Sequence, residues 1–235
     1  MATPAAKKKT GILAFYESQT GKKLLTGVTG LGLALFTVVH MLGNLNYFIS
    51  YDAYNVYAYK LASLGPLLWA AELGLLAFVL LHAVIGVTIY IRKRRARPKG
   101  YVKYKSAGGV SKQNAASRSM IITGIVLAVF LVFHLKAFKF GAYYETVVDG
   151  QVMRDLTILL EQKFASVWYV LGYVSVVVLL GLHLRHGVWS AFQSLGAIKP
   201  SLRPLLILIG IVVAIGVVVG FIALPIWIFV DAHFV

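Results

Sequence analysis

The sequence predicts an all-α integral membrane protein with five transmembrane helices, and both its composition and its apolar runs support this class. Hydrophobic residues make up 59% of the 235 residues, charged residues make up 13%, and the mean hydropathy is +0.80. Soluble domains are about half apolar and about a quarter charged. Apolar runs of about 20 residues, the length needed to cross a bilayer core of about 30 Å, occur five times along the chain.

The runs predict spans at about residues 24–47, 67–91, 118–138, 164–192 and 205–230. The second span ends in RKRRARPKG, and Pro225 interrupts the last span near its end. Residues 1–23 are basic, but their apolar piece GILAF is too short for a signal peptide, so we expect a cytoplasmic segment with a short surface helix. The motif VVDGQV between the third and fourth spans predicts a tight Asp-Gly turn. No internal repeat stands out.

The net charge of +15 is distributed as a topology signal rather than as a nucleic-acid surface. Lys and Arg gather before the first span, between residues 92 and 118, and between residues 199 and 203, whereas the alternate connections hold most of the acidic residues. The positive-inside rule therefore predicts a multi-pass protein of the cell membrane with its N-terminus inside and its C-terminus outside. The basic side can also dock anionic lipid or a partner protein, and no nucleic-acid partner is expected.

Five histidines inside the predicted spans are the main functional signal: His40, His82, His134, His183 and His186. One such histidine is explained equally well by a hydrogen bond to a neighbouring helix or by a function, but five on four helices favour a function. The chain has no cysteine, which excludes thiolate-ligated iron–sulfur clusters and covalent c-type haem. A sixth histidine, His233, lies near the outer end of the last span, where water is expected.

The depths of four histidines along their spans form two pairs. At about 1.5 Å per residue, His40 and His134 lie about 25 Å and 24 Å from the basic starts of their spans, toward the outer face. His82 lies only about 15 Å before Arg92, toward the inner face, and His183 lies about as far before the inner end of its span.

In a sequential antiparallel four-helix bundle, the members of each pair face each other across a diagonal. Neutral imidazole is a good axial ligand of haem iron. We therefore predict two bis-histidine haems b in a four-helix bundle, with the fifth span outside it because its apolar stretch has no histidine.

Glycines one turn after two of these histidines leave room for a flat macrocycle, although glycines also allow close helix packing. Gly86 follows His82 and Gly187 follows His183 at i+4, on the same helix face. This glycine favours His183 over His186 as the ligand and leaves His186 as a neighbour of the haem or of its propionates. Four basic residues can neutralise inner haem propionates or reach lipid headgroups: Arg118, Arg185, Lys22 and Lys23.

Four histidine-bearing segments, taken in order, resemble the cytochrome b membrane-anchor subunit of succinate dehydrogenases and fumarate reductases, in the single-chain, five-helix, dihaem class. They are TGVTGLGLALFTVVHMLGNL, LLHAVIGVTIYIRK, TGIVLAVFLVFHLKAF and GLHLRHGVWSAFQSLG. Carried over residue by residue, the resemblance makes His40 and His134 the ligands of the outer haem, and His82 and His183 those of the inner haem.

The resemblance also implies partners and an activity. A flavoprotein subunit would oxidise succinate, and an iron–sulfur subunit would pass the electrons through the haems to a quinone, usually menaquinone in this class. This chain would be the quinone-reactive membrane subunit of that succinate:quinone oxidoreductase. It has no flavin or iron–sulfur motif of its own.

In this family the quinone is thought to bind near the outer haem, where this chain has DAYNVYAY. Tyr54 and Asn55 can hydrogen-bond a quinone carbonyl there, although an interfacial aromatic belt also explains the tyrosines. Some members carry a proton-transferring glutamate where this chain has Asn55, and others carry a membrane glutamate where it has Gly181; neither residue transfers protons. Glu72, in the outer part of the second span, is a candidate proton relay or an interfacial carboxylate.

Two other functions stay open. The chain can anchor another membrane dehydrogenase or hydrogenase, or act alone as a transmembrane electron carrier, in which case the haems remain and the partners change. It can also be a haem-free transporter or anchor that uses its histidines as a proton relay. Subunit composition tests the first alternative, and a b-type absorption band tests the second.

Overall fold

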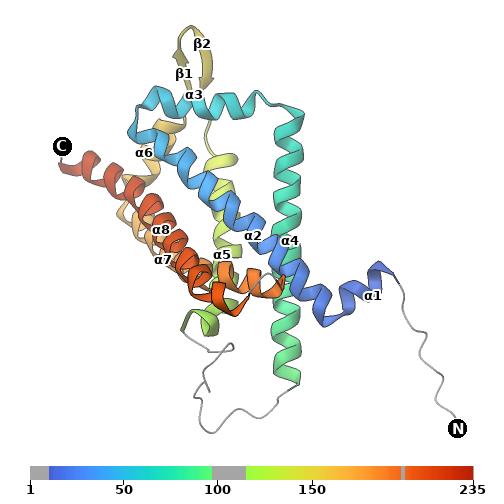
Figure 1. The fold of residues 1–235 in the computed structure, drawn as a ribbon. Coiled ribbons are helices and arrows are strands. Elements are labelled where there is room, and N and C mark those ends of the chain that lie inside the picture. Colours follow the sequence, from blue (N-terminus) through green and yellow to red (C-terminus); the bar gives the residue numbers. More distant parts are fainter. Residues whose placement is uncertain (1–10, 97–114, 197–198, 235) are drawn as a thin grey trace, which may run out of the picture.

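A computed structural model describes residues 11–96, 115–196 and 199–234 and consists mostly of helices (Figure 1). Five of the described helices are long and apolar enough to cross a membrane, which confirms that part of the prediction. They are α2 (Gln19–Asn44), α4 (Pro66–Arg95), α5 (Ala115–His134), α7 (Val167–Ser194) and α8 (Arg203–Phe234). Pro225 lies inside α8 without ending it.

Several spans begin or end away from their predicted boundaries. α2 begins before residue 24 because the side chain of Ser18 caps it by accepting a hydrogen bond from the N–H of Gly21. α4 continues to Arg95, since Arg and Lys are good helix formers and their charge is favourable at a helix C-terminus. The fourth span, predicted to start at about residue 164, begins at Val167: α6 (Leu156–Phe164) ends at Phe164, and Ser166, in an extended conformation, separates the two helices.

One end of the spans carries a β-hairpin, and we call it the hairpin end (Figure 1). Strand β1 (Glu145–Val148) pairs antiparallel with β2 (Gln151–Arg154). Asp149 and Gly150 join them with φ angles of 50° and 78°, as a two-residue type I′ turn requires. The predicted Asp-Gly turn is therefore confirmed.

Short helices complete the hairpin end. The Tyr- and Asn-rich connection after α2 forms a 3-10 turn η1 (Leu45–Phe48) and then α3 (Tyr51–Ala62), which lies across the ends of the spans (Figure 1). Ser50 starts α3 by accepting from the N–H of Ala53. A π-helical turn, η3 (Leu135–Lys139), continues α5 directly after His134.

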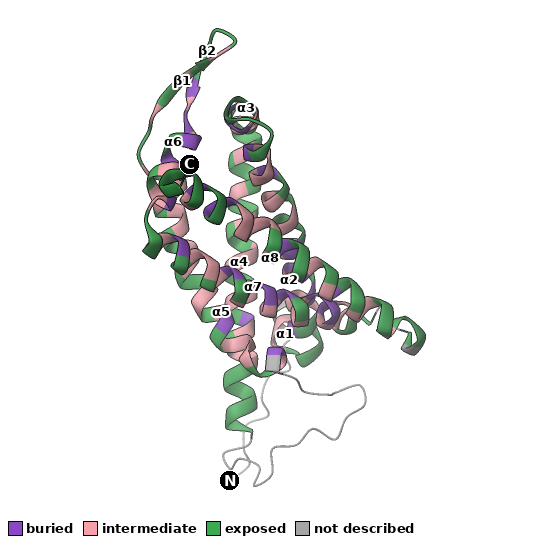
Figure 2. Ribbon diagram, turned by 90° about the vertical axis from the view of Figure 1, so that its left-hand side faces the viewer, coloured by how far each residue is buried: buried purple, intermediate pink, exposed green. Residues whose placement is uncertain are grey.

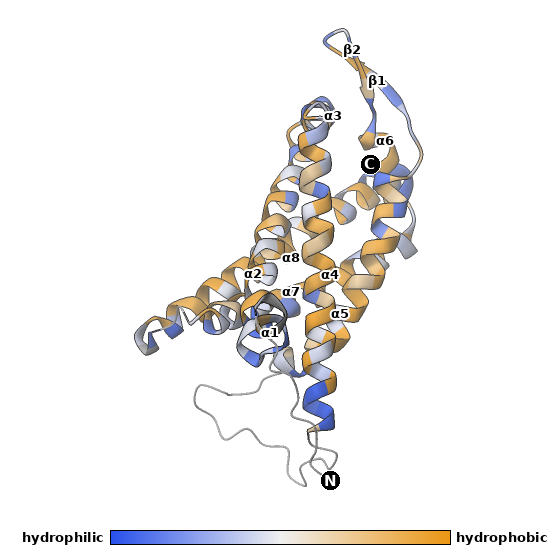
Figure 3. Cartoon of the chain, turned by 90° about the vertical axis from the view of Figure 1, so that its right-hand side faces the viewer, coloured by the Kyte–Doolittle hydropathy of each residue, from blue (hydrophilic) through white to orange (hydrophobic). Residues whose placement is uncertain are grey.

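The opposite end of the spans is the basic end. The short helix α1 (Ile12–Glu17) precedes α2 there, and the 3-10 turn η4 (Pro200–Leu202) precedes α8. The hydrophilic end of α4, Arg92–Arg95, also lies at this end (Figure 3). α1 falls where a short surface helix was predicted.

The packing of the spans follows a simple neighbour relation. α2 packs beside α4 and α7, α5 packs beside the same two helices, and α8 packs against α7 and α2. One buried cluster joins α2, α7 and α8, and consists of Ala34, Leu184, Val188, Ala214 and Val217. α4 is much more exposed, with Ile85 as its one fully buried residue (Figure 2). Its apolar surface is suited to contact with lipid.

Candidate functional site

Two pairs of histidine rings meet between the spanning helices. At the hairpin end, His40 of α2 and His134 of α5 have ring centroids 5.9 Å apart and ring planes at 85°. Phe36 stacks on His40 at 5.4 Å, and Phe130 lies 5.5 Å from His134. The hydroxyl of Tyr173 lies 3.3 Å from Nδ1 of His134. Both rings are half-buried among aromatic side chains.

The second pair lies nearer the basic end. His82 of α4 and His183 of α7 have ring centroids 6.3 Å apart and ring planes at 64°. Nδ1 of His82 lies 3.3 Å from the hydroxyl oxygen of Thr29 on α2, and Nδ1 of His183 lies 3.0 Å from that of Thr123 on α5. Each imidazole in this pair therefore has a hydroxyl partner on a neighbouring helix.

The separations within both pairs suit two axial ligands on one metal ion. Imidazole nitrogen binds a first-row metal at about 2.0–2.1 Å, so with about 1.1 Å from that nitrogen to each ring centre, two opposed imidazoles have centroids about 6.3 Å apart. The distances of 5.9 Å and 6.3 Å match this value closely. In the part of the chain that the structure describes, no group of three or more His, Cys, Asp or Glu side chains can hold a metal. A metal at either pair would need further ligands besides these side chains, and a porphyrin is one group that provides them.

The two pairs lie at different depths. The rise along α2 from Thr29, beside the His82 ring, to His40 is about 16 Å at 1.5 Å per residue. The rise along α5 from Thr123, beside the His183 ring, to His134 is the same. The predicted pairing of depths and the ring contacts therefore coincide, while the ligand role of the rings stays a prediction.

An internal repeat underlies this symmetry, although none stood out in the sequence. TGLGLALFTVVH, ending at His40, and TGIVLAVFLVFH, ending at His134, share the pattern T-G-x5-F-x3-H. The other two helices share H-x3-G-V, starting at His82 and His183. Thr29 and Thr123 were not predicted as site residues, and aligning the spans on their histidines is the signal that marks them.

Glycines next to the threonines let the rings approach the facing helix. A Cβ on Gly30 would lie 3.1 Å from Cε1 of His82, and one on Gly124 would lie 3.5 Å from Cε1 of His183. A Cβ on Gly86 or Gly187, the glycines predicted to leave room for a macrocycle, would meet no atom within 4 Å. Open space therefore lies beside Gly86 and Gly187. The close contacts of the His82 and His183 rings are with Gly30 and Gly124 on the facing helices.

His186 lies one turn from His183 on α7, but its ring contact is with a tryptophan. The His186 ring packs against Trp189 at 5.7 Å, and the guanidinium of Arg203 lies 5.7 Å from the same Trp189 ring. Nδ1 of His186 is buried and has no hydrogen-bond partner among the described residues. The structure thus pairs His183, rather than His186, with His82.

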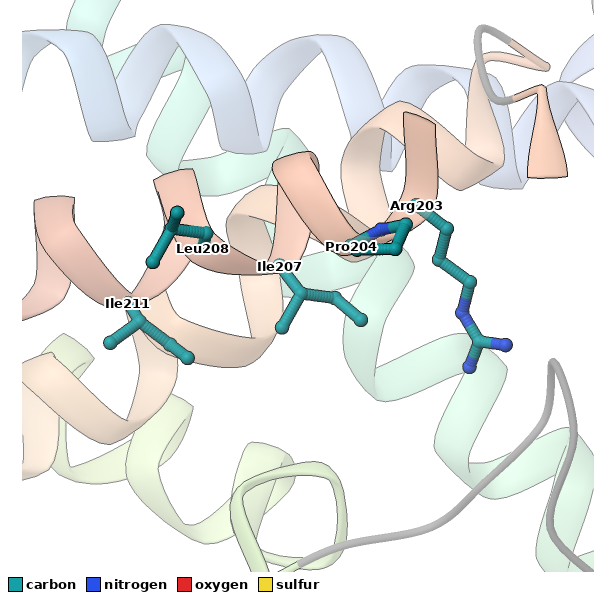
Figure 4. A pocket seen from close by; sticks show the side chains of 5 residues that line it. All are labelled: Arg203, Pro204, Ile207, Leu208 and Ile211. Atoms are coloured by element: carbon teal, nitrogen blue, oxygen red, sulfur yellow. The ribbon is translucent and has the colours of Figure 1, made fainter. Parts of the chain in front are cut away.

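Three of the four basic residues predicted near the propionates are exposed: Lys23, Arg118 and Arg185. Lys22 is buried instead, because its Nζ donates to the carbonyl of Glu17 and lies over the Tyr16 ring. A shallow pocket elsewhere, on α8, is lined by Arg203, Pro204, Ile207, Leu208 and Ile211 (Figure 4). It contains none of the histidines.

The predicted quinone residues Tyr54 and Asn55 hold α3 against its neighbours. The Asn55 amide donates to Oδ1 of Asp155 at 3.1 Å and accepts from the N–H of Leu156 at 2.9 Å, and its side chain is 2% exposed. The Tyr54 hydroxyl donates to Oδ1 of Asn44 at 3.2 Å, and burial raises its pKa. Both residues therefore have intramolecular partners, and quinone binding by either stays a prediction.

Asp155 is the centre of this buried hydrogen-bond network. Its Oδ1 caps α6 by accepting from the N–H groups of Thr157 and Ile158, and it also accepts from the Thr157 hydroxyl. Burial alone would raise the pKa of Asp155, but the hydrogen bonds from Thr157, Asn55 and the backbone outweigh it and lower that pKa. The network fixes α3 and α6 to one another.

Glu72 forms an ion pair with Lys139, which also lies 5.2 Å from the centre of the Trp69 ring. Arg154 donates to the backbone carbonyls of Phe138 and Ala142 at the same end. These contacts hold the π-helical turn that follows His134; such turns occur often at functional sites. Glu72 is thus a paired, half-buried carboxylate at the hairpin end, and its role as a proton relay stays a prediction.

No protein-family model, curated protein or solved structure matches the chain. The two histidine pairs and their surroundings therefore carry the functional argument. The resemblance of the four histidine segments to the cytochrome b anchors remains a sequence-based expectation.

Proposed function

We propose that the chain is a dihaem cytochrome b membrane subunit. In this proposal α2, α4, α5 and α7 form the haem-binding bundle and α8 packs outside it. His40 and His134 would hold one haem b, and His82 and His183 the other. The observation that carries the proposal is the meeting of two imidazole pairs at two depths, with ring separations of 5.9 Å and 6.3 Å.

The residues fit the group chemically as well as geometrically. Neutral imidazole is a common axial ligand of haem iron, and each pair supplies two of them with no competing carboxylate nearby among the described contacts. When bound, each haem would supply a one-electron carrier. Phe36 and Phe130 pack against the hairpin-end rings and make their surroundings apolar, which favours retention of a flat apolar cofactor.

The two depths of the histidine pairs favour electron transfer along the bundle. Two electron carriers about 16 Å apart along the bundle can connect one membrane face with the other. The chain's own part is to fix the imidazoles on rigid helices and to keep the space between the two levels apolar. This arrangement supports electron transfer across the membrane better than proton relay, because the histidines form two separate pairs rather than one continuous chain of rings.

We further propose that the chain anchors a succinate:quinone oxidoreductase. Its flavoprotein and iron–sulfur subunits would dock at the basic end, on the cytoplasmic side, and a quinone, most simply menaquinone, would react at the hairpin end. The four segments that resemble the family and the basic charge of Arg92–Arg95 support this orientation. The N-terminus would then be inside and the C-terminus outside the cell membrane.

Purification of the full chain from its native membrane tests this proposal. We expect a reduced-minus-oxidised spectrum with a b-type band, together with stoichiometric flavin and iron–sulfur subunits. A b-type band with other dehydrogenase or hydrogenase subunits would keep the haems and replace the partner. The absence of a b-type band would favour the haem-free histidine relay.

A further inference from the structure

The basic-end histidine pair is held from both sides by buried threonines. The Thr29 hydroxyl oxygen lies 3.3 Å from Nδ1 of His82, and the Thr123 hydroxyl oxygen lies 3.0 Å from Nδ1 of His183. The two threonines are 3% and 1% exposed. Each comes from a helix next to the one that carries the histidine, and each precedes a glycine that lets the ring approach.

The hydroxyl protons are already used on the threonines' own helices. Thr29 Oγ1 donates to the carbonyl of Leu25 at 2.7 Å, and Thr123 Oγ1 donates to the carbonyl of Ser119 at 3.0 Å. A hydroxyl has one proton and two acceptor lone pairs. Because a hydroxyl that donates to its own helix offers only lone pairs elsewhere, each threonine oxygen is an acceptor toward histidine, and the proton of the contact belongs to Nδ1 of the imidazole. His82 has the backbone carbonyl of Thr26 as a second acceptor.

This direction of donation determines the tautomer. A neutral imidazole that carries its proton on Nδ1 has its free lone pair on Nε2. Outer partners of this kind orient metal-binding histidines and increase their basicity. The hairpin-end pair differs, because Nδ1 of His134 faces the phenol of Tyr173, for whose proton the described residues offer no backbone acceptor.

We propose that Thr29 and Thr123 are positioning residues that hold His82 and His183 in the Nδ1–H tautomer, with Nε2 as the metal-binding atom, and thereby lower the reduction potential at the basic-end pair. The inference rests on the proposed haem-binding function. It assigns to the T-G dipeptides a role that differs from helix packing: the threonine sets the tautomer, and the glycine sets the distance.

The reduction potential follows from the same hydrogen bonds. An imidazole that donates to a good acceptor gains electron density, which stabilises the oxidised metal. Removing the acceptor oxygen therefore shifts the potential of the basic-end centre to more positive values. The hairpin-end centre, about 16 Å away along the bundle, is expected to keep its potential.

The test uses the full chain in its native complex, with Thr29→Val, Thr123→Val and the double substitution, since valine keeps the shape and removes the hydroxyl. Thr37→Val is the matched control, because Thr37 also lies on α2 and donates to its own helix, at the Leu33 carbonyl. Thr29→Ser and Thr123→Ser restore the hydroxyl. Potentiometric titration and the low-spin iron electron paramagnetic resonance spectrum are the readouts.

We expect each valine variant to shift the reduction potential of the basic-end centre to more positive values, and the double variant to shift that potential further. The control and the serine variants should match the parent chain. Loss of the basic-end haem in the valine variants, with retention in the serine variants, would also support the hydroxyl role. Loss in both would overturn it, because restoring the hydroxyl would then fail to restore the centre.

Failure of the inference and failure of the proposed function are distinguishable. If the parent chain holds two haems b but the valine variants keep both potentials and both spectra, the threonine role is wrong and the haem assignment stands. If the parent chain binds no haem, both are wrong.

Discussion

Substitution of Asp155 by alanine tests how the hairpin end is held together. The change removes the N-cap of α6, which costs about 0.5–2 kcal/mol. It also leaves the buried Asn55 amide without its acceptor, and a buried donor without a partner costs about 1–3 kcal/mol. We therefore expect the free energy of unfolding to fall by about 2–4 kcal/mol, since both costs act at one buried position.

The assay is unfolding in mixed micelles by sodium dodecyl sulfate, followed by tryptophan fluorescence. Asp155→Asn is an informative second variant. Asparagine caps helices about as well as aspartate and keeps one acceptor oxygen, so the free energy of unfolding should be close to that of the parent chain. Asp52→Ala is the control, because Asp52 is exposed in the first turn of α3. Equal, small effects of Asp155→Ala and Asp52→Ala would refute the buried-network argument.

Three further predictions concern contacts elsewhere in the molecule. Gly30→Ala should reduce haem occupancy at the basic-end pair, because the new Cβ would lie 3.1 Å from the His82 ring. Gly74→Ala is the control and should leave haem occupancy unchanged, because its Cβ would meet no atom within 4 Å. A pyridine haemochrome assay measures the haem content of both variants. The pKa of Asp155 is lowered on folding, so its contribution to stability is present above its unfolded pKa and is lost as pH falls through the folded pKa. The midpoint of detergent-induced unfolding should therefore fall in acid, and it should fall less in the Asp155→Asn variant. Glu72→Gln breaks the ion pair with Lys139; since the two side chains are 29% and 33% exposed, stability measured in micelles should fall by only about 0.2–1 kcal/mol.

The spans and the pairing of the histidines could be predicted from the sequence because a bilayer constrains both. A membrane core fixes the length of an apolar helix, and the fixed rise per residue then turns sequence position into depth. His40 and His134, and His82 and His183, could therefore be matched before any contact was known. The rings of each pair do meet in the structure.

The hairpin end could not be predicted in the same way. α3 forms in a connection with little apolar periodicity, and Asn55 of α3 bonds to Asp155, 100 positions away in the sequence. The break between α6 and α7 lies at Ala165 and Ser166, just after Phe164, and hydropathy alone joined Phe164 to the apolar run that follows. Such short elements depend on tertiary partners more than on their own propensities.

The threonines of the basic-end pair were missed for a related reason. A threonine in an apolar helix is ordinary, and its hydroxyl usually bonds its own backbone, as those of Thr26 and Thr37 do. Only the rotation of α2 and α5 about their axes brings Thr29 and Thr123 to the rings. The repeated T-G pattern contains that information, but it is visible only after the spans are aligned on their histidines.

The most direct test of the central claim is the number of haems b per chain, counted in the purified full chain and in five single variants. We predict two haems per chain, and one after His40→Ala, His134→Ala, His82→Ala or His183→Ala, with the first two variants losing one centre and the last two losing the other. His186→Ala should keep both. A parent chain without haem b, or a loss caused by His186→Ala but not by His183→Ala, would contradict the account.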